Sequence, residues 1–337
     1  MKDNFLTDIT VSVYVDDIKI ICKDLSQIQA LKNDIALEFK IDDIRLISYY
    51  LDIKITRDRE NRTITLSQED YIRKILELLN MNKDHSTATS DISGKYYEAN
   101  SGSAFIEDSH SYLHLINILM YEMIQTCPDY AFQISHLASF AKNPSSKYFG
   151  AIKHLICYLH GMVNYCIIYS SIDEADLFGH SDANFGACRI TRQSTEAYVF
   201  MLNGDLISWP SKQQSIVTLS TTETEYYALS QAIKEAFWLQ KLLADLKLYS
   251  FDPSMPIPIF VDSTGAIKTG QNFIENDWIK HFDIHYHFVR DEVSSGRICL
   301  SYVRSKDNLV DALIKSLTKP LHDFFIKGLR LKKPAEL

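Results

Sequence analysis

The sequence contains no run of about 20 apolar residues, the length that a membrane-spanning helix needs. Its first residues, MKDNFLTDITVSVYVDD, carry acidic side chains early and lack the basic start and apolar stretch of a secretion signal. Six cysteines are scattered along the chain with no C-x-x-C pair, which is typical of reduced, intracellular thiols. We therefore expect an intracellular protein without a secretion signal or a membrane partner.

Basic side chains are fewer than acidic ones, with 35 Lys and Arg against 43 Asp and Glu and a net charge of −8. This balance excludes a protein whose whole surface attracts nucleic acid. The charge is uneven, however, because the stretch 278–337 contains eleven basic and seven acidic residues. We expect any surface for a polyanion in this C-terminal part, and metal ions that offset acidic clusters elsewhere.

The 337 residues, 46% of them hydrophobic and 23% charged, suggest two globular domains. Residues 8–22 alternate apolar and polar side chains around Asp16 and Asp17, which predicts two short strands with an acidic turn. Residues 83–110 are poor in apolar side chains and predict a long exposed loop. The other predictions are a hairpin over 49–55 and 62–66, and helices over 25–39, 111–125, 129–141, 146–160 and after Ser67.

The pattern changes from residue 177 onward. A first strand is predicted to end at Asp182, and a later strand, Ile257–Val261, ends directly before Asp262. Asn203-Gly204 lies between two further strands and predicts a tight two-residue turn, because both positions need positive φ. With helices over about 221–247 and 280–294, a strand over 297–303 and a last helix near Asn308, the order is β-β-β-α-β-α-α-β-α. This order predicts a mixed sheet with helices on its faces.

Four carboxylates in this half are placed where they could meet. Asp182 and Asp262 are expected at strand ends, and Asp311 in the first turn of the last helix, where a helix N-terminus favours an anion. The fourth comes from Ser-Thr-Thr-Glu-Thr-Glu at 220–225. Either glutamate of this segment could supply it, so the two must be distinguished.

The choice between Glu223 and Glu225 depends on the helix face. Ser220 and Glu223 form a capping box, which gives Glu223 a local structural role. Glu225 instead shares a face with Leu229 and Ile233, the residues expected to pack on the sheet. A carboxylate on such a face is costly unless it is paired or binds a metal ion. We therefore select Glu225.

Four converging carboxylates would hold two divalent cations about 3.5–4 Å apart. Such a pair can activate water, stabilise a leaving oxygen and hold a phosphodiester between the two ions. All-oxygen ligands that leave several waters in place suit Mg²⁺, and Mn²⁺ is the alternative. Asp182, Glu225, Asp262 and Asp311 are thus the candidate metal ligands and catalytic residues. For any one of them alone, the ordinary reading is a helix cap or a solvated strand end.

Long segments of the chain resemble the Pol polyproteins of copia-type LTR retrotransposons. HSDANFGACRITRQSTEAYVFMLNGDLISWPSKQQSIVTLSTTETEYYALSQAIKEAFWLQKLL, VDSTGAI, KHFDIHYHFVRDEVSSGRI and NLVDALIKSLTKPL are similar to their ribonuclease H (RNase H) domain. YVDD at 14–17 resembles the polymerase motif of their reverse transcriptase, and YYLDIKI, LSQEDYIRKILELL and AIKHLICYLHG resemble segments that follow it. The similarity runs in order through roughly residues 8–325.

The resemblance implies an α+β protein in which a truncated reverse-transcriptase palm and thumb remnant precedes an RNase H-like mixed sheet. It implies hydrolysis of RNA in RNA–DNA hybrids, with Asp182, Glu225, Asp262 and Asp311 as the metal-binding set. Lys280 and His281 are expected near the nucleic acid. The implied partners are the hybrid and the rest of a Pol polyprotein, in the cytoplasm or in a virus-like particle.

The resemblance also implies that Tyr14, Asp16 and Asp17 belong to the polymerase site. A polymerase of this kind needs a further aspartate from a strand well upstream, and only thirteen residues precede Tyr14. We expect no polymerase activity from this chain alone, so these three residues would be vestigial. Two alternatives stay open: an inactive relic or weak nucleic-acid-binding module, and a polymerase completed by upstream sequence.

The expected division assigns a partial palm with the YVDD hairpin to 1–82, a flexible loop to 83–110, a helical thumb or connection to 111–170, an RNase H-like domain to 176–325 and a basic tail to 326–337. The tail is expected to be a frayed terminus, with contact to a phosphate backbone as the alternative. The chain departs from the family's usual pattern at several positions. Among them, Asp52 replaces a glycine and Cys127 replaces an arginine.

Overall fold

The computed structural model describes residues 9–81, 86–90, 109–170, 176–188, 191–247, 252–271 and 283–333. Most of the predicted loop over 83–110 lies outside these residues. Among the described helices, none is long and apolar enough to cross a membrane.

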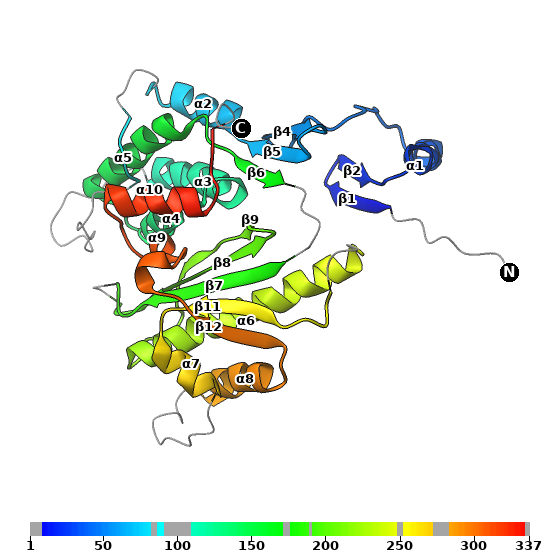
Figure 1. Ribbon diagram of the computed structural model, residues 1–337. Coiled ribbons are helices and arrows are strands. Elements are labelled where there is room, and N and C mark those ends of the chain that lie inside the picture. The colour runs from blue at the N-terminus through cyan, green and yellow to red at the C-terminus, as the bar shows by residue number, and fades with distance from the viewer. Residues whose placement is uncertain are drawn as a thin grey trace.

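The YVDD motif lies in a small two-stranded ribbon. Strands β1 (Thr10–Tyr14) and β2 (Asp17–Ile21) are antiparallel, as the alternation of residues 8–22 predicts. Helix α1 (Leu25–Glu38) follows, and none of its side chains is buried. Figure 1 shows the ribbon and α1 at the edge of the molecule. The ribbon forms a sheet of its own, and the Lys19 ammonium lies 4.8 Å from the centre of the Tyr50 ring. This part therefore contributes little to the core.

An antiparallel sheet of four strands follows in the order β3 (Tyr49–Tyr50), β4 (Ile53–Asp58), β5 (Thr63–Ser67) and β6 (Ile167–Ser170). The predicted hairpin is confirmed, but its first strand is split in two by a turn at Leu51 and Asp52. Strand β6 was not predicted, and it pairs with β5 from about 100 residues further along the chain.

A helical layer connects this sheet to the second half of the chain. It consists of α2 (Glu69–Leu78), α3 (Ser109–Gln125), a 3-10 turn (Pro128–Tyr130), α4 (Ala131–Ala138) and α5 (Ser146–Met162). Cys127, which stands where the resemblance leads us to expect an arginine, lies in this layer. It is buried next to the buried carboxyl of Glu122. Burial raises the pKa of Glu122 well above its ordinary value.

The second large sheet has the strand order β10-β8-β7-β11-β12, with β9 also paired to β8. Strand β8 is antiparallel to β7, β9 and β10, whereas β11 pairs parallel to both β7 and β12. Their bounds are Leu177–Asn184, Thr195–Leu202, Asp205–Ser208, Ser211–Gln213, Ile257–Val261 and Ile298–Tyr302 for β7 to β12. The expected mixed sheet with helices on its faces is confirmed, with β10 as an unpredicted addition.

Helices cover both faces of this sheet (Figure 1). Alternate residues of β8 belong to two separate cores, with Val199 and Met201 in one and Phe200 in the other. The core around Phe200 contains residues of α6 (Thr221–Asp245), α7 (Thr264–Gln271) and α8 (Asp283–Ser294). The core around Val199 contains the helical layer together with α9 (Asp311–Ile314) and α10 (Lys319–Gly328). The helical layer therefore shares its core with the mixed sheet.

Two tight turns use the same backbone conformation with different residues. In the β8–β9 hairpin, Asn203 and Gly204 have φ values of 57° and 76°, which confirms the turn predicted there. In the β3–β4 hairpin, Leu51 and Asp52 have φ values of 49° and 55°. A residue with a Cβ is strained in this left-handed region, and glycine is not. This strain explains why glycine is usual where Asp52 stands.

We predict that Asp52→Gly increases the free energy of unfolding by about 0.5–1 kcal/mol, because glycine removes the strain of positive φ. Chemical denaturation measures this change. Asp52→Ala is the matched control, since it removes the carboxylate, and with it the 3.4 Å ion pair to Lys74, but keeps the Cβ. An equal gain in both variants would contradict the explanation.

Candidate active site

Asp182 lies on the central strand of the mixed sheet. It is paired with Ala197 of β8 and is only 4% exposed. The strand continues to Asn184, so the prediction that it ends at Asp182 is wrong by two residues. The extra residues keep Asp182 inside the sheet, where the Ala183 N–H donates to its Oδ1 at 2.7 Å. The carboxylate is thereby fixed in a buried position.

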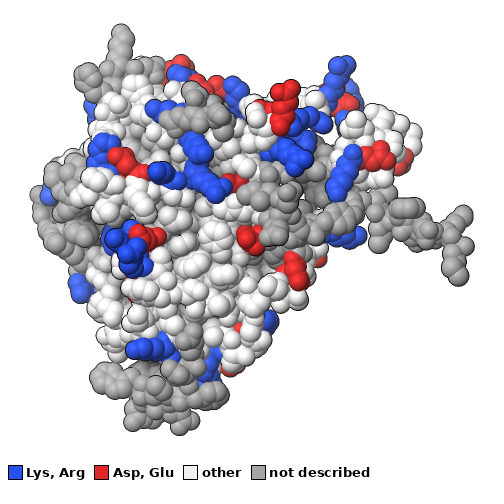
Figure 2. Space-filling view, in the orientation of Figure 1, with Lys and Arg blue, Asp and Glu red and all other residues white. Residues whose placement is uncertain are grey.

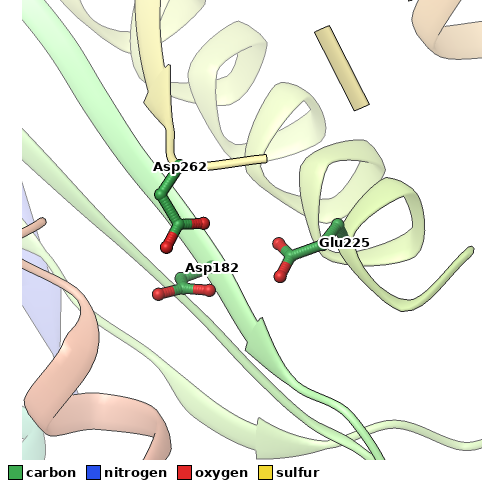
Figure 3. Close-up of side chains that lie close together, drawn as sticks. All are labelled: Asp182, Glu225 and Asp262. Carbon is green, nitrogen blue, oxygen red and sulfur yellow. The ribbon is translucent and has the colours of Figure 1, made fainter. Parts of the chain in front are cut away.

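Two further carboxylates converge on Asp182. Asp262 directly follows β11, as predicted, and β11 runs parallel to β7. Glu225 reaches the same place from the first turns of α6. Ligand oxygens of Asp182, Glu225 and Asp262 all lie within 4.8 Å of one another. Figure 3 shows the three carboxyl groups pointing toward one another from three different elements.

The expected distinction between the two glutamates of this segment is present in the structure. Ser220 caps α6 by accepting a hydrogen bond from the Glu223 N–H at 3.1 Å. The Glu223 carboxylate accepts the Leu219 N–H at 2.7 Å and so stays at the helix start. Glu225 is left free to face the sheet, on the side of α6 that also buries Leu229 and Ile233.

Asp311 is the first residue of the short helix α9 and lies beside the other three without joining their cluster. Its carboxylate forms an ion pair of 2.8 Å with Lys315. Asp311 is still close enough to raise the pKa of Asp182 by charge repulsion.

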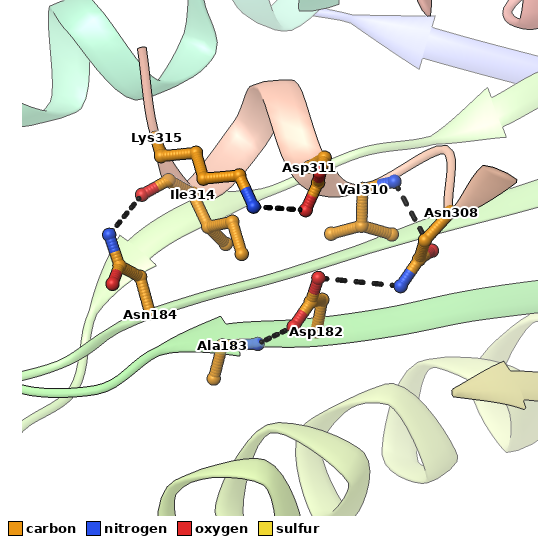
Figure 4. A network of polar contacts seen from close by, with 8 residues as sticks. All are labelled: Asp182, Ala183, Asn184, Asn308, Val310, Asp311, Ile314 and Lys315. Carbon is orange, nitrogen blue, oxygen red and sulfur yellow. Dashed lines mark hydrogen bonds and ion pairs between the residues drawn. The ribbon is translucent and has the colours of Figure 1, made fainter. Parts of the chain in front are cut away.

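Two asparagines attach α9 to the central strand (Figure 4). The Asn308 amide donates to Asp182 Oδ2 at 3.4 Å, and its side-chain oxygen accepts the Val310 N–H at 3.4 Å. At the other end of the helix, the Asn184 amide donates to the Ile314 carbonyl at 3.2 Å. The sequence analysis did not select Asn308, Asn184 or Lys315. The available signal was the polar residue three positions before Asp311 and the lysine one helical turn after it.

The carboxylates raise one another's pKa values. Burial is the largest cause for both Asp182 and Glu225, and repulsion adds to it, from Asp262 and Asp311 for Asp182 and from Asp182 and Asp262 for Glu225. The pKa values of both groups lie well above the ordinary carboxyl range. Lys315 lowers both of these pKa values but does not offset the rise. The cluster therefore carries uncompensated negative charge unless protons or cations bind.

The donor set fits divalent metal ions. It consists of carboxylate oxygens only, which hard cations prefer, and the three oxygens lie close enough to contact one ion. Of the described residues, only this trio brings three possible metal ligands together. The acidic cluster is therefore compatible with a divalent cation.

The expected polymerase residues lie elsewhere. Tyr14 ends β1, Asp17 begins β2, and Asp16 lies in the turn between them, with all three side chains exposed. Among the described residues, no other carboxylate joins Asp16 and Asp17 in a possible metal cluster. Lys280 and His281 fall outside the described residues.

We predict that the metal-free protein loses stability as the pH rises above about 4, the ordinary carboxyl pKa. The folded pKa values of Asp182 and Glu225 are raised, so the folded state binds protons that the unfolded chain releases. Adding Mg²⁺ or Mn²⁺ at about pH 8 should then raise the melting temperature, because cations replace the missing protons. Thermal melts with EDTA and with each metal measure both effects.

The matched variants for this prediction are Asp182→Asn and Asp245→Asn. Without metal at about pH 8, Asp182→Asn should melt above the wild type, because it removes one buried charge, and it should gain less from metal. Asp245 is exposed at the end of α6, so its variant should behave as the wild type does. Equal metal-induced shifts in all three proteins would show that the cluster does not bind the cation.

A family model matches the start of the chain, and two Pol polyproteins match nearly all of it. Residues 2–93 match the family model for reverse transcriptase (RNA-dependent DNA polymerase). The chain is 31% identical over 319 residues to the retrovirus-related Pol polyprotein from transposon TNT 1-94 of Nicotiana tabacum. This match covers 93% of the chain and 23% of that polyprotein. It is 29% identical over 307 residues to the retrovirus-related Pol polyprotein from transposon RE1 of Arabidopsis thaliana. This match covers 91% of the chain and 20% of that polyprotein.

Among solved structures, LC11-RNase H1, isolated from compost, matches 41% of the chain and 92% of its own length, with 16% identity and a TM-score of 0.32. The chain spans about a fifth of the length of the two Pol polyproteins. The reverse-transcriptase match at its start and the ordered similarity along more than nine-tenths of its length lead to one assignment: the chain belongs to the Pol polyprotein family of copia-type retrotransposons.

Proposed function

We propose that this chain hydrolyses the RNA strand of RNA–DNA hybrids with two divalent metal ions, Mg²⁺ or Mn²⁺. The observation that carries the proposal is the convergence of Asp182, Glu225 and Asp262 within 4.8 Å on an RNase H-like sheet. Three buried or half-buried carboxylates in contact are costly, and a cation-dependent activity explains why they are together.

The four carboxylates would divide two cations between them. Asp182 would contribute to both sites, because the charges of both Asp262 and Asp311 act on it. Glu225 and Asp262 would complete the first site, and Asp311 would hold the second. When bound, the two ions supply an activated water and stabilise the oxygen that leaves the phosphodiester.

The remaining residues position these ligands. Asn308 links Asp182 to the start of α9 and so fixes the carboxylates of Asp182 and Asp311 relative to each other. Lys315 neutralises part of the Asp311 charge. A hybrid would be recognised through the shape of its minor groove and its 2′-hydroxyls, so we expect little sequence preference. The products would carry 3′-hydroxyl and 5′-phosphate ends, as the resemblance implies.

A second candidate function is supported by the reverse-transcriptase match over residues 2–93. Asp16 and Asp17 would then be two of the metal ligands of a polymerase site. Both are exposed, and the described residues supply no third carboxylate beside them. We propose that polymerisation requires a further aspartate beside Asp16 and Asp17, which the described residues do not supply, and that the ribonuclease is the activity of the RNase H-like part.

The proposed domain limits stay those of the sequence: a partial palm, a loop, a helical connection, an RNase H-like domain and a basic tail. The shared core around Val199 suggests that the helical connection and the RNase H-like sheet unfold together. The pairing of β6 with β5 links the palm segment to the same body.

We predict that the purified chain cleaves the RNA strand of a labelled hybrid when Mg²⁺ or Mn²⁺ is present and not with EDTA. Asp182→Asn should lower the cleavage rate more than about 100-fold, because even outer partners of metal ligands typically account for 10–100-fold. Gel analysis of the labelled RNA measures the rate. Asp245→Asn is the matched control and should cleave as the wild type does.

Folded protein that binds the metal but cleaves no hybrid would contradict this function and favour an inactive relic. Cleavage that persists in Asp182→Asn would indicate a contaminating nuclease. Circular dichroism on each variant establishes that loss of cleavage does not reflect loss of fold.

A further inference from the structure

A basic surface lies along α10 and the segment that follows it. We call it the α10 surface and define it by three exposed lysines, Lys319, Lys327 and Lys332. Lys319 is paired with Asp323 at 2.9 Å. Among the described residues, no carboxylate lies within 4 Å of Lys327 or Lys332. Two of the three positive charges are therefore free to attract an anion.

The segment that carries these lysines is fixed in place, contrary to the expectation of a frayed terminus. Leu329 and Leu331 are buried in the core of the helical layer. The Cys166 N–H donates to the Lys332 carbonyl at 2.9 Å, and the Lys332 N–H donates to the Cys166 carbonyl at 3.2 Å. The Lys333 ammonium lies 5.2 Å from the centre of the Tyr165 ring. The side chains thus extend from an ordered backbone, which lowers the entropy cost of binding.

The three lysines surround a hollow of about 600 Å³ between α5 and α10. Tyr158 and Tyr165 form part of its wall on the α5 side, and His322 lines it from α10. Asp323 is the one carboxylate in the lining, so the lining has an excess of positive charge. A hollow with lysines around it suits a phosphate group, which accepts hydrogen bonds from each of them.

The α10 surface follows the helix that carries Asp311 after a short connection. Helix α9 carries Asp311, and Lys319 begins α10 five residues after α9 ends. Figure 1 shows α10 next to α9, on the side of the molecule where β7 ends. Figure 2 shows a row of Lys and Arg side chains across the upper part of this face, where α10 lies in Figure 1, with a few acidic groups among them. A strand leaving the carboxylates along α9 would therefore meet these lysines.

We propose that the α10 surface binds the phosphate backbone of the hybrid outside the cleavage point. This inference rests on the proposed function, because it takes the hybrid as the ligand. The chain has a net charge of −8, so a polyanion needs a local basic surface to approach the acidic cluster. Phosphate contacts of this kind position a duplex without reading its sequence.

The test compares the double variant Lys327→Gln/Lys332→Gln with Lys54→Gln/Lys241→Gln, which removes two exposed lysines from β4 and α6. Both are made in full-length Asp182→Asn protein so that the hybrid stays intact. Fluorescence anisotropy measures binding of a labelled hybrid long enough to extend past α10, over a range of salt concentrations. Melting temperatures confirm that both proteins are folded.

We expect the α10 double variant to bind about 5–10-fold more weakly and to lower the slope of log affinity against log salt by about 1–2. The control should keep the affinity and the slope of its parent. Equal losses in both variants, or no loss in either, would overturn the proposal. Competition by polyglutamate as effective as by hybrid would also overturn it, because the surface would then suit an acidic polypeptide.

Binding is measured here without cleavage, so this result is separate from the ribonuclease activity. A protein that cleaves hybrid but keeps its affinity in the α10 double variant would contradict only the α10 proposal. A protein that cleaves nothing but loses affinity and salt slope as expected would contradict only the proposed function.

Discussion

The mutual repulsion of three buried or half-buried carboxylates is the constraint on which the functional interpretation depends. Asp182, Glu225 and Asp262 come from a strand, a helix and a strand end that are up to 80 residues apart in sequence. Folding brings their oxygens within 4.8 Å, and burial together with repulsion raises the pKa values of Asp182 and Glu225. Holding these like charges together costs folding free energy, and the packing of the mixed sheet must offset that cost.

The scaffold works because both faces of the sheet are covered. Strand β8 directs alternate side chains into two cores, one with α6 and α8 and the other with the helical layer, α9 and α10. The second core joins residues as distant as Ile72 and Leu331. The side chains of Asn308 and Asn184 form hydrogen bonds that attach α9 to β7. The position of Asp311 thus depends on the helical layer that precedes the mixed sheet in the sequence.

Much of this arrangement could be predicted from the sequence. Alternation and turn residues indicated the ribbon at Asp16-Asp17, the Asn203-Gly204 turn and the strand before Asp262, and the capping box separated Glu223 from Glu225. The pairing of β6 with β5 could not be predicted, because it joins segments about 100 residues apart through backbone hydrogen bonds. The turn at Leu51-Asp52 was missed because its residues lack the usual glycine. Asn308 and Lys315 were missed because their importance depends on three-dimensional proximity to Asp182 and Asp311.

The central claim is that these carboxylates hold a pair of cations, and crystallography with Mn²⁺ tests it most directly. Anomalous diffraction from crystals grown with Mn²⁺ locates each ion independently of any enzymatic assay. We expect two peaks about 3.5–4 Å apart, with oxygens of Asp182 near both and Asp311 beside the second. A map without peaks at the cluster, or with a single ion held away from Asp182, would contradict it.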